Sequence, residues 1–179
     1  MPGHAEKAYT GKVLIAADHA GYALKSALIS AMPEVAWQDL GPASTERVDY
    51  PDYAETLARQ LSARSSSQGA SSKLISAGET LGVLICGSGV GMCIAANKFD
   101  GVRAALADNV TIAQLSREHN NANVICLGAR FTAVDYAADI LRAFFAADFS
   151  GGRHADRVRK ISLIEAHRSP SLTAKAGSP

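Results

Sequence analysis

The chain has 179 residues, of which 20% are charged, and its formal net charge is +1. This length predicts one compact domain with a sizeable core. The nearly neutral charge excludes the strongly basic surface of a nucleic-acid-binding protein and an acidic interaction tail. The longest uncharged run, residues 81–97, contains four glycines and is too short to span a membrane, so we expect neither nucleic acid nor membrane as a partner.

Short apolar runs alternate with stretches of helical periodicity along the chain. Predicted strands cover residues 12–17, 35–40, 81–86, 102–107 and 123–128. Predicted helices cover residues 22–32, 53–64, 92–98, 110–117 and 134–147, followed by a last helix over 151–168. Almost continuously apolar strands joined by helices indicate a parallel sheet covered on both faces. We therefore predict an α/β fold: a three-layer, doubly wound, Rossmann-like five-stranded parallel sheet with an extra C-terminal helix.

Two polar segments interrupt this alternation. Residues 62–78 are rich in serine and glycine, which predicts a flexible insertion. A passive surface loop is favoured there over a regulatory segment. The tail, residues 169–179, has the same character and is predicted to be disordered. Residues 1–168 are then expected to form a single domain.

The cysteines and the N-terminal residues indicate the cellular compartment of the protein. Cys86, Cys93 and Cys126 form an odd set without a CxxC pair, and each lies in an apolar stretch. This pattern predicts reduced thiols and a cytoplasmic location. The first residues lack the layout of a signal peptide, and targeting to an organelle stays open. No cluster of His, Cys and Asp has the spacing of a zinc site, so we predict neither metal nor cofactor.

Ligands of such sheets lie beyond the carboxyl ends of the strands. Asp18 and His19 follow the first predicted strand, either as a helix cap with a solvated imidazole or as site residues. Cys86 ends the third strand and is followed by Gly87-Ser88-Gly89-Val90-Gly91. Alternate glycines let a ligand approach the backbone and leave N–H groups free for an oxyanion or a phosphate. The GxGxG spacing makes a dinucleotide the weaker ligand hypothesis.

The role of Cys86 stays open at this stage. Its place at a strand end, directly before a helix, favours a reactive thiolate, but a small buried residue explains it equally well. Cys93 and Cys126 fall inside a helix and a strand, so core packing explains them better.

Further polar residues follow the fourth predicted helix. His119 begins a polar turn that leads into the fifth strand, and Arg130 follows that strand. Arg153 and Arg157 are four residues apart and share one face of the last helix. Guanidinium groups match phosphate geometry, although a solvated basic face is the ordinary explanation for such arginines.

Six segments are distributed over nearly the whole chain, in this order: AADHAGYALK, VDYPDYA, ICGSGVGMCIAANK, GVRA, REHNNANVICLGAR and GGRHADRV. Together they resemble the type B ribose-5-phosphate isomerases of the ribose/galactose isomerase family. The resemblance implies a cofactor-free aldose–ketose isomerase that interconverts ribose 5-phosphate and ribulose 5-phosphate in the non-oxidative pentose phosphate pathway. Alternatives are an isomerase of allose or galactose 6-phosphate, and a non-catalytic module that binds phosphosugars or nucleotides.

Residue roles follow from the same resemblance. Cys86 matches the base that moves the proton, and Ser88, a threonine in many relatives, matches the hydroxyl beside it. A second branch of the family uses a glutamate base where this chain has Met92, which cannot accept a proton. The enediolate is expected to bind the N–H groups of the loop that contains Gly87, Gly89, Val90 and Gly91.

The resemblance also assigns ring opening, sugar binding and phosphate binding to residues from both ends of the chain. It implies that Asp18 and His119 open the furanose ring, and that Tyr50 and Asn120 contact the sugar. The phosphate is expected to bind His19, Arg130, Arg153 and Arg157. It further implies a homodimer, or a tetramer, in which the last helix or the region of His119 reaches into the site of the partner subunit.

Overall fold

The computed structural model describes residues 9–66 and 80–168. The strands are β1 (Lys12–Ala17), β2 (Ala36–Asp39), β3 (Leu81–Cys86), β4 (Ala104–Leu106) and β5 (Val124–Gly128). The helices are α1 (Tyr22–Ala31), α2 (Tyr50–Ser66), α3 (Val90–Ala96), α4 (Val110–Asn120), α5 (Val134–Ala146) and α6 (Arg153–Arg168). Each predicted strand and helix is present, which confirms the α/β prediction. None of the helices in the described part of the chain is long and apolar enough to cross a membrane.

Some boundaries differ from the prediction. Helix α6 begins at Arg153 rather than residue 151, because Gly151 and Gly152 have φ angles of 62° and 52°, outside the helical region. Helix α2 extends through residues 62–66, which the sequence assigns to the serine-rich insertion. The rest of that insertion and the tail, residues 169–179, lie outside the described residues.

The sheet is parallel throughout, with strand order β2-β1-β3-β5-β4. After β2 the chain returns past β1 to form β3 on the other side, so the direction of winding reverses between β1 and β3. In doubly wound sheets the crevice at such a reversal is where ligands bind. The residues that follow β1 and β3 are therefore in the expected place for a site.

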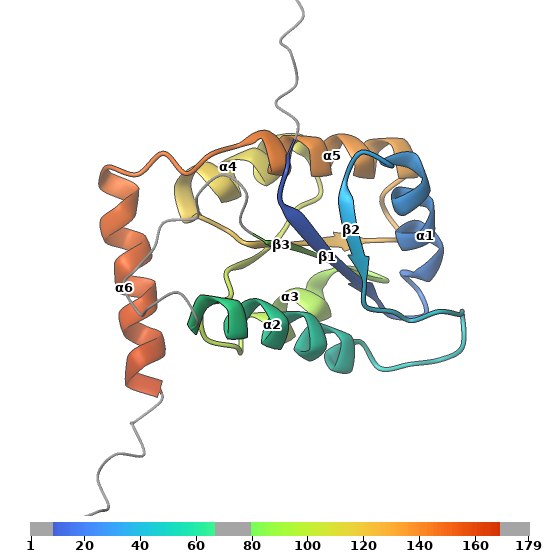
Figure 1. Cartoon of the computed structure of the whole chain (residues 1–179), viewed down its shortest axis with the longest axis horizontal. Coiled ribbons are helices and arrows are strands. Elements are labelled where there is room, and N and C mark those ends of the chain that lie inside the picture. The colour runs from blue at the N-terminus through green and yellow to red at the C-terminus, as the bar shows by residue number, and fades with distance from the viewer. Residues whose placement is uncertain (1–8, 67–79, 169–179) are drawn as a thin grey trace, which may run out of the picture.

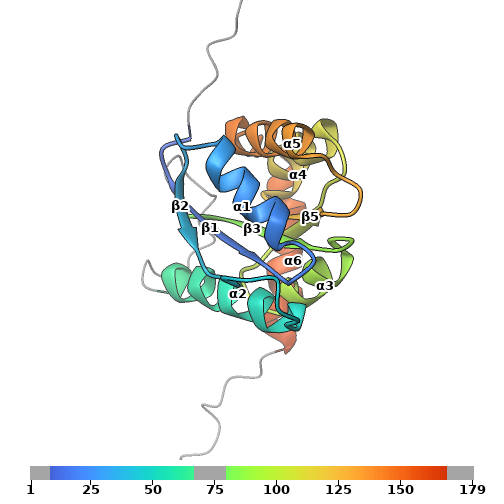
Figure 2. The same cartoon turned by 90° about the vertical axis from the view of Figure 1, so that its right-hand side faces the viewer.

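Alternate strand residues point into two separate cores. On one face Val13, Ile15 and Ile85 pack with residues of α1, α4 and α5. On the other face Leu14 and Leu84 pack with residues of α2 and α3. Figures 1 and 2 show these three layers, with α1, α4 and α5 on one side of the sheet and α2 and α3 on the other. This arrangement confirms the doubly wound, three-layer prediction.

Helix α6 stands apart from these layers at one end of the molecule (Figure 1). Its carboxylate at Glu165 accepts a hydrogen bond from the backbone N–H of Gly101 at 3.2 Å. Ile161, Leu163 and Ile164 on this helix are 40%, 53% and 64% exposed. The extra C-terminal helix thus keeps an apolar surface that the rest of the described chain does not cover.

Candidate active site

The turn after β1 is held against the end of β3. The backbone N–H of Asp18 donates to the carbonyl of Ile85 at 3.1 Å. The N–H of Gly21 donates to the Asp18 carboxylate at 2.9 Å. A Cβ at Gly21 would lie 2.5 Å from the Ile85 carbonyl oxygen, so only glycine allows this approach. Asp18, which is 7% exposed, is therefore fixed beside the residue that precedes Cys86.

Cys86 is buried, and its sulfur is also engaged by the glycine loop. Its side chain is 5% exposed. The backbone N–H of Gly89 points at Sγ at 3.1 Å, and Gly89 reaches this position with a φ of 77°. An N–H donor is the contact that a thiolate accepts more strongly than a thiol does. Cys86 is thus a buried residue whose sulfur faces a backbone donor.

The loop glycines provide space for two other predicted site residues. A Cβ at Gly87 would lie 3.2 Å from the guanidinium carbon of Arg130, whose backbone N–H donates to the Gly87 carbonyl at 3.1 Å. A Cβ at Gly91 would lie 2.8 Å from the ring of Tyr50. Without side chains at these positions, the guanidinium and the phenol ring both lie directly against the loop. Ser88 also belongs to the loop, and its Oγ accepts the N–H of Val90 at 3.4 Å.

His19 lies at the same edge of the sheet. Its Nδ1 is 3.0 Å from the carbonyl oxygen of Val48 and 3.4 Å from the backbone nitrogen of that residue. One of these contacts is available to the ring in either tautomer. Val48 is a contact that the sequence did not indicate. The structure thus gathers Asp18, His19, Tyr50, Cys86, residues 87–91 and Arg130 into one group, the carboxyl-edge group.

The other predicted residues lie at the opposite edge. His119 and Asn120 end α4, and the chain then enters β5. At that point the carbonyl of Asn123 accepts the N–H of Gly82 at the start of β3, whereas Cys86 ends β3. The four residue steps from Gly82 to Cys86 separate the two edges by roughly 13 Å. Within one chain, His119 and Cys86 are therefore too far apart to act on the same atoms.

Helix α6 packs its first turn on the end of α4. The rings of His119 and His154 are stacked, with centroids 4.2 Å apart and planes 4° apart. Arg153 and Arg157 lie on the same helix as His154. We call His119, Asn120, His154, Arg153 and Arg157 the amino-edge group. Sequence reasoning gave His154 no role, although its position between two candidate phosphate arginines was the available signal.

Positive neighbours affect the protonation of His154. Burial lowers its pKa, and His119, Arg153 and Arg157 lower it further because a second positive charge beside them is unfavourable. The stacked pair therefore favours a neutral imidazole at His154.

The other two thiols lie on the α2/α3 face of the sheet. Burial raises the pKa of Cys126 well above its ordinary value. A hydrogen bond from Cys126 is the main cause that lowers the pKa of Cys93 to about 7, although burial opposes the shift. The amide of Asn97 also lies 3.6 Å from the Cys93 sulfur. Cys126 is the core thiol that the sequence predicts, whereas Cys93 is half-buried and polarised.

Both groups carry anion-binding chemistry. Arg130 and the loop N–H groups belong to the carboxyl edge, and Arg153 and Arg157 belong to the amino edge. Within residues 9–66 and 80–168, no three His, Cys, Asp or Glu side chains come together as a metal site. The arrangement suits a small anion with a reacting carbon near Cys86.

Comparison with known proteins agrees with this chemistry. A family model described as Ribose/Galactose Isomerase matches residues 13–161. Ribose-5-phosphate isomerase B of Escherichia coli is 39% identical over 161 residues, which cover 88% of this chain and 99% of that protein. A probable ribose-5-phosphate isomerase B of Mycoplasma pneumoniae is 42% identical over 156 residues, which cover 86% and 94%.

Solved structures show the same similarity. Ribose-5-phosphate isomerase B of Clostridium thermocellum superposes with a TM-score of 0.77 at 39% identity, covering 88% of this chain and 99% of that one. The enzyme of Mycoplasma genitalium, solved with bound ribulose-5-phosphate, superposes with a TM-score of 0.76 at 39% identity, covering 88% and 97%. The similarity includes both the carboxyl-edge and the amino-edge groups, since the matched residues 13–161 contain them.

Proposed function

The chain belongs to the ribose/galactose isomerase family, and we propose that it interconverts ribose 5-phosphate and ribulose 5-phosphate with Cys86 as the base. The family makes it a sugar phosphate isomerase. The observation that carries the assignment of the base is the Gly89 N–H directed at the Cys86 sulfur at 3.1 Å. Asp18, held against the end of the same strand, supplies an acid at that place.

The reaction moves one proton between two carbons and needs no net oxidant. Once the ring is open, Cys86 takes the proton from C2, which gives an enediolate with its negative charge on O1, and protonation of O1 gives the enediol. The thiol then returns the proton to C1, O2 loses its proton, and the C2 carbonyl forms. The loop N–H groups and the Ser88 hydroxyl stabilise the negative oxygen. Asp18 and His119 exchange the protons that open the furanose ring.

The phosphate is a remote handle for this chemistry. Arg130 and His19 at the carboxyl edge and Arg153 and Arg157 at the amino edge provide cationic donors of suitable geometry. Binding energy at the phosphate holds C1 and C2 against Cys86 and so contributes to alignment. Tyr50 and Asn120 contact the sugar between these ends.

The separation of the two groups supports a site shared between two copies of the chain. In a symmetric dimer, the amino-edge group of one subunit lies over Cys86 of the other, and two equivalent sites result. Exposed apolar side chains support this pairing. Val90 lies in the loop, Ile94 and Phe131 follow the loop and Arg130 in the chain, and Ile161, Leu163 and Ile164 belong to the same helix as Arg153 and Arg157. A tetramer of such dimers has the same sites.

The five-carbon substrate is supported by the Mycoplasma genitalium relative, whose structure contains ribulose-5-phosphate. The alternative within the same chemistry is a six-carbon phosphate. Parallel assays with ribose 5-phosphate, allose 6-phosphate and galactose 6-phosphate compare the two, and the highest kcat/KM identifies the substrate. A higher value for either hexose phosphate would contradict the five-carbon assignment.

Replacement of the thiol tests the base. We expect Cys86→Ala to lower kcat by roughly 10²–10⁴-fold, because general-base catalysis contributes about that factor. The melting temperature stays near that of the wild type. The control Cys93→Ala, at a half-buried thiol of α3, keeps its activity. Turnover of Cys86→Ala near the wild-type rate would exclude the proposed base. Binding of sugar phosphates without any turnover by the wild type would favour the non-catalytic alternative.

We also propose that the protein is cytoplasmic and that it acts in the non-oxidative pentose phosphate pathway. The three cysteines, all among the described residues, are free thiols, which supports a reducing compartment.

A further inference from the structure

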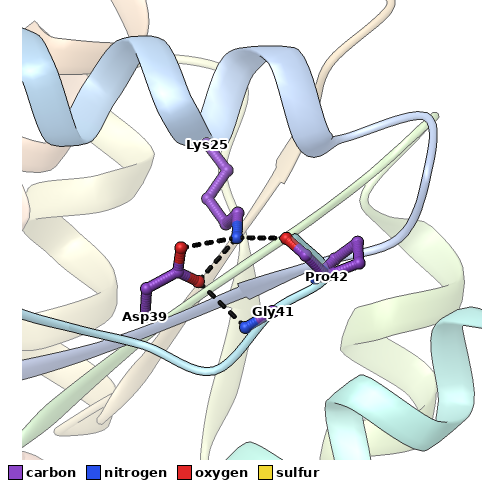
Figure 3. Close-up of polar contacts among 4 residues, drawn as sticks. All are labelled: Lys25, Asp39, Gly41 and Pro42. Carbon is purple, nitrogen blue, oxygen red and sulfur yellow. Dashed lines mark hydrogen bonds and ion pairs between the residues drawn. The ribbon is translucent and has the colours of Figure 1, made fainter. Parts of the chain in front are cut away.

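A buried lysine joins helix α1 to the segment that follows β2 (Figure 3). Lys25 is 1% exposed, and its Nζ lies 2.6 and 2.7 Å from the two carboxylate oxygens of Asp39. The third acceptor is the carbonyl of Pro42 at 2.8 Å. These hydrogen bonds go to Asp39 at the end of β2 and to Pro42 just after it, so they fix the end of β2 and the segment that follows it relative to α1.

Packing alone does not require a lysine at this position. The neighbours Leu24 and Leu28 on the same helix are buried and apolar. Burial of an ammonium costs free energy that a close ion pair only offsets, so a well-packed apolar side chain often gives similar stability. What the ion pair adds is a directional link between two segments, and the question is what that link holds in place.

One series of contacts leads from Lys25 to the proposed ring-opening acid. The Asp39 carboxylate accepts the N–H of Gly41 at 2.9 Å. The carbonyl of Gly41 accepts the N–H of Ala17 at 3.0 Å. Ala17 directly precedes Asp18, whose own N–H is bonded to the end of β3. The position of Asp18 thus depends on the segment that Lys25 holds.

A second series of contacts leads to the proposed sugar contact. Gly41 packs on the ring of Tyr53, since a Cβ there would lie 2.9 Å from the Tyr53 Cε1 atom. Tyr53 is in the first turn of α2, which begins with Tyr50. The Tyr50 ring in turn lies against Gly91 in the glycine loop. The same segment therefore sets the position of Tyr50 over the loop.

We propose that Lys25 and Asp39 are positioning residues of the isomerase, which hold Asp18 and Tyr50 at the substrate. The proposal rests on the proposed function. Neither residue touches the substrate, and both act through residues 41–42. Loss of the ammonium leaves the sheet and the Cys86 loop intact but displaces the groups that open the ring and contact the sugar.

The test compares three variants at a temperature where each is fully folded. Lys25→Met removes the ammonium and leaves the Asp39 carboxylate, which is 45% exposed, without its partner. Lys25→Met/Asp39→Asn removes both charges, so that no carboxylate is left without its counter-charge. The control is Leu28→Ala, which weakens the packing of the same helix one turn away without touching the ion pair. We expect kcat/KM to fall at least about tenfold in the first two variants, since a small misplacement of reacting groups can cost about 10²-fold. The control stays within about twofold of the wild type, because it makes no polar contact with the site.

A second readout separates positioning from a general loss of structure. Ribulose 5-phosphate is acyclic, so exchange of its C1 proton with D₂O needs Cys86 but not the ring step. We expect the ratio of exchange to isomerisation to rise severalfold in the two ion-pair variants and to stay constant in Leu28→Ala.

The outcomes are distinguishable from a failure of the proposed function. Normal kcat/KM in both ion-pair variants, or equal losses of exchange and isomerisation in all three, would overturn the positioning role while the isomerase assignment stands. A wild type that isomerises no sugar phosphate would overturn both. If Lys25→Met does not fold, the double variant decides the matter.

Discussion

At the level of single residues, the glycines of the loop after β3 have specific partners inside the chain. The alternation of glycines predicts backbone N–H groups that face a ligand, whereas the Gly89 N–H points at the Cys86 sulfur of the same chain. The sequence could not predict that Gly87 and Gly91 also make room for Arg130 and Tyr50, because those residues come from distant segments.

The role of Gly91 can be tested with a methyl group. In Gly91→Ala the new Cβ meets the Tyr50 ring, which must move away from the loop. We expect KM for ribose 5-phosphate to rise severalfold with a smaller change in kcat, because a sugar contact is displaced while the base stays in place. Gly82→Ala is the matched control, since its Cβ meets Leu57 at 2.7 Å in the core, away from Tyr50 and the glycine loop. It should lower the melting temperature and leave KM unchanged; a normal KM in Gly91→Ala would refute the contact.

The thiol of Cys93 provides a pH-dependent prediction. Its pKa is lowered to about 7, chiefly by the hydrogen bond from Cys126. In a Cys86→Ser background, the rate of Cys93 alkylation by iodoacetamide should rise through about pH 7 and level off above it, because the thiolate is the nucleophile. Cys126→Ala should move that midpoint to higher pH. Mass spectrometry identifies the alkylated residue, and an unchanged midpoint in Cys126→Ala would contradict the assigned cause.

At the level of elements, the periodic apolar runs predicted the strands and helices, whereas the ends of these elements depend on contacts with residues outside each run. The predicted strand 102–107 is reduced to Ala104–Leu106. The side chain of Asn97 bonds both the N–H and the carbonyl of Ala104 at 2.9 Å, as a neighbouring strand would. The side chain of Asn97, the C-cap of α3, therefore covers the start of β4, and no local pattern in residues 102–107 indicates it.

The contact between α4 and α6 is also expected to depend on pH. The folded pKa of His154 lies below its unfolded value, so the unfolded chain binds more protons between the two values. This group's contribution to stability is complete above the unfolded pKa of about 6.5 and is lost as the pH falls toward the folded pKa. His154→Phe keeps an aromatic stack on His119 but has no group that titrates at this position. Below about pH 6.5, we expect its melting temperature to fall less with decreasing pH than that of the wild type. Thermal melts over that range measure this difference, and parallel curves for the two proteins would contradict it.

At the level of the whole molecule, the two groups of proposed site residues lie at opposite edges of the sheet, so one chain does not bring them together. The sequence resemblance implied a shared site but left open which segment crosses to the partner. The length of the β-strands separates Cys86 from His119, and the sequence pattern does not show this separation. This separation supports a dimer in which the partner supplies His119, Asn120 and the arginines of α6.

Mixing two inactive variants tests this account most directly. Cys86→Ala and His119→Ala are each expected to be nearly inactive as homodimers. If the sites are shared, a heterodimer of the two has one site with both native residues and one site with neither. Co-refolding equal amounts should then restore about a quarter of wild-type activity, because half of the dimers are mixed and each has one working site of two. A mixture that stays as inactive as either variant alone would contradict the shared site.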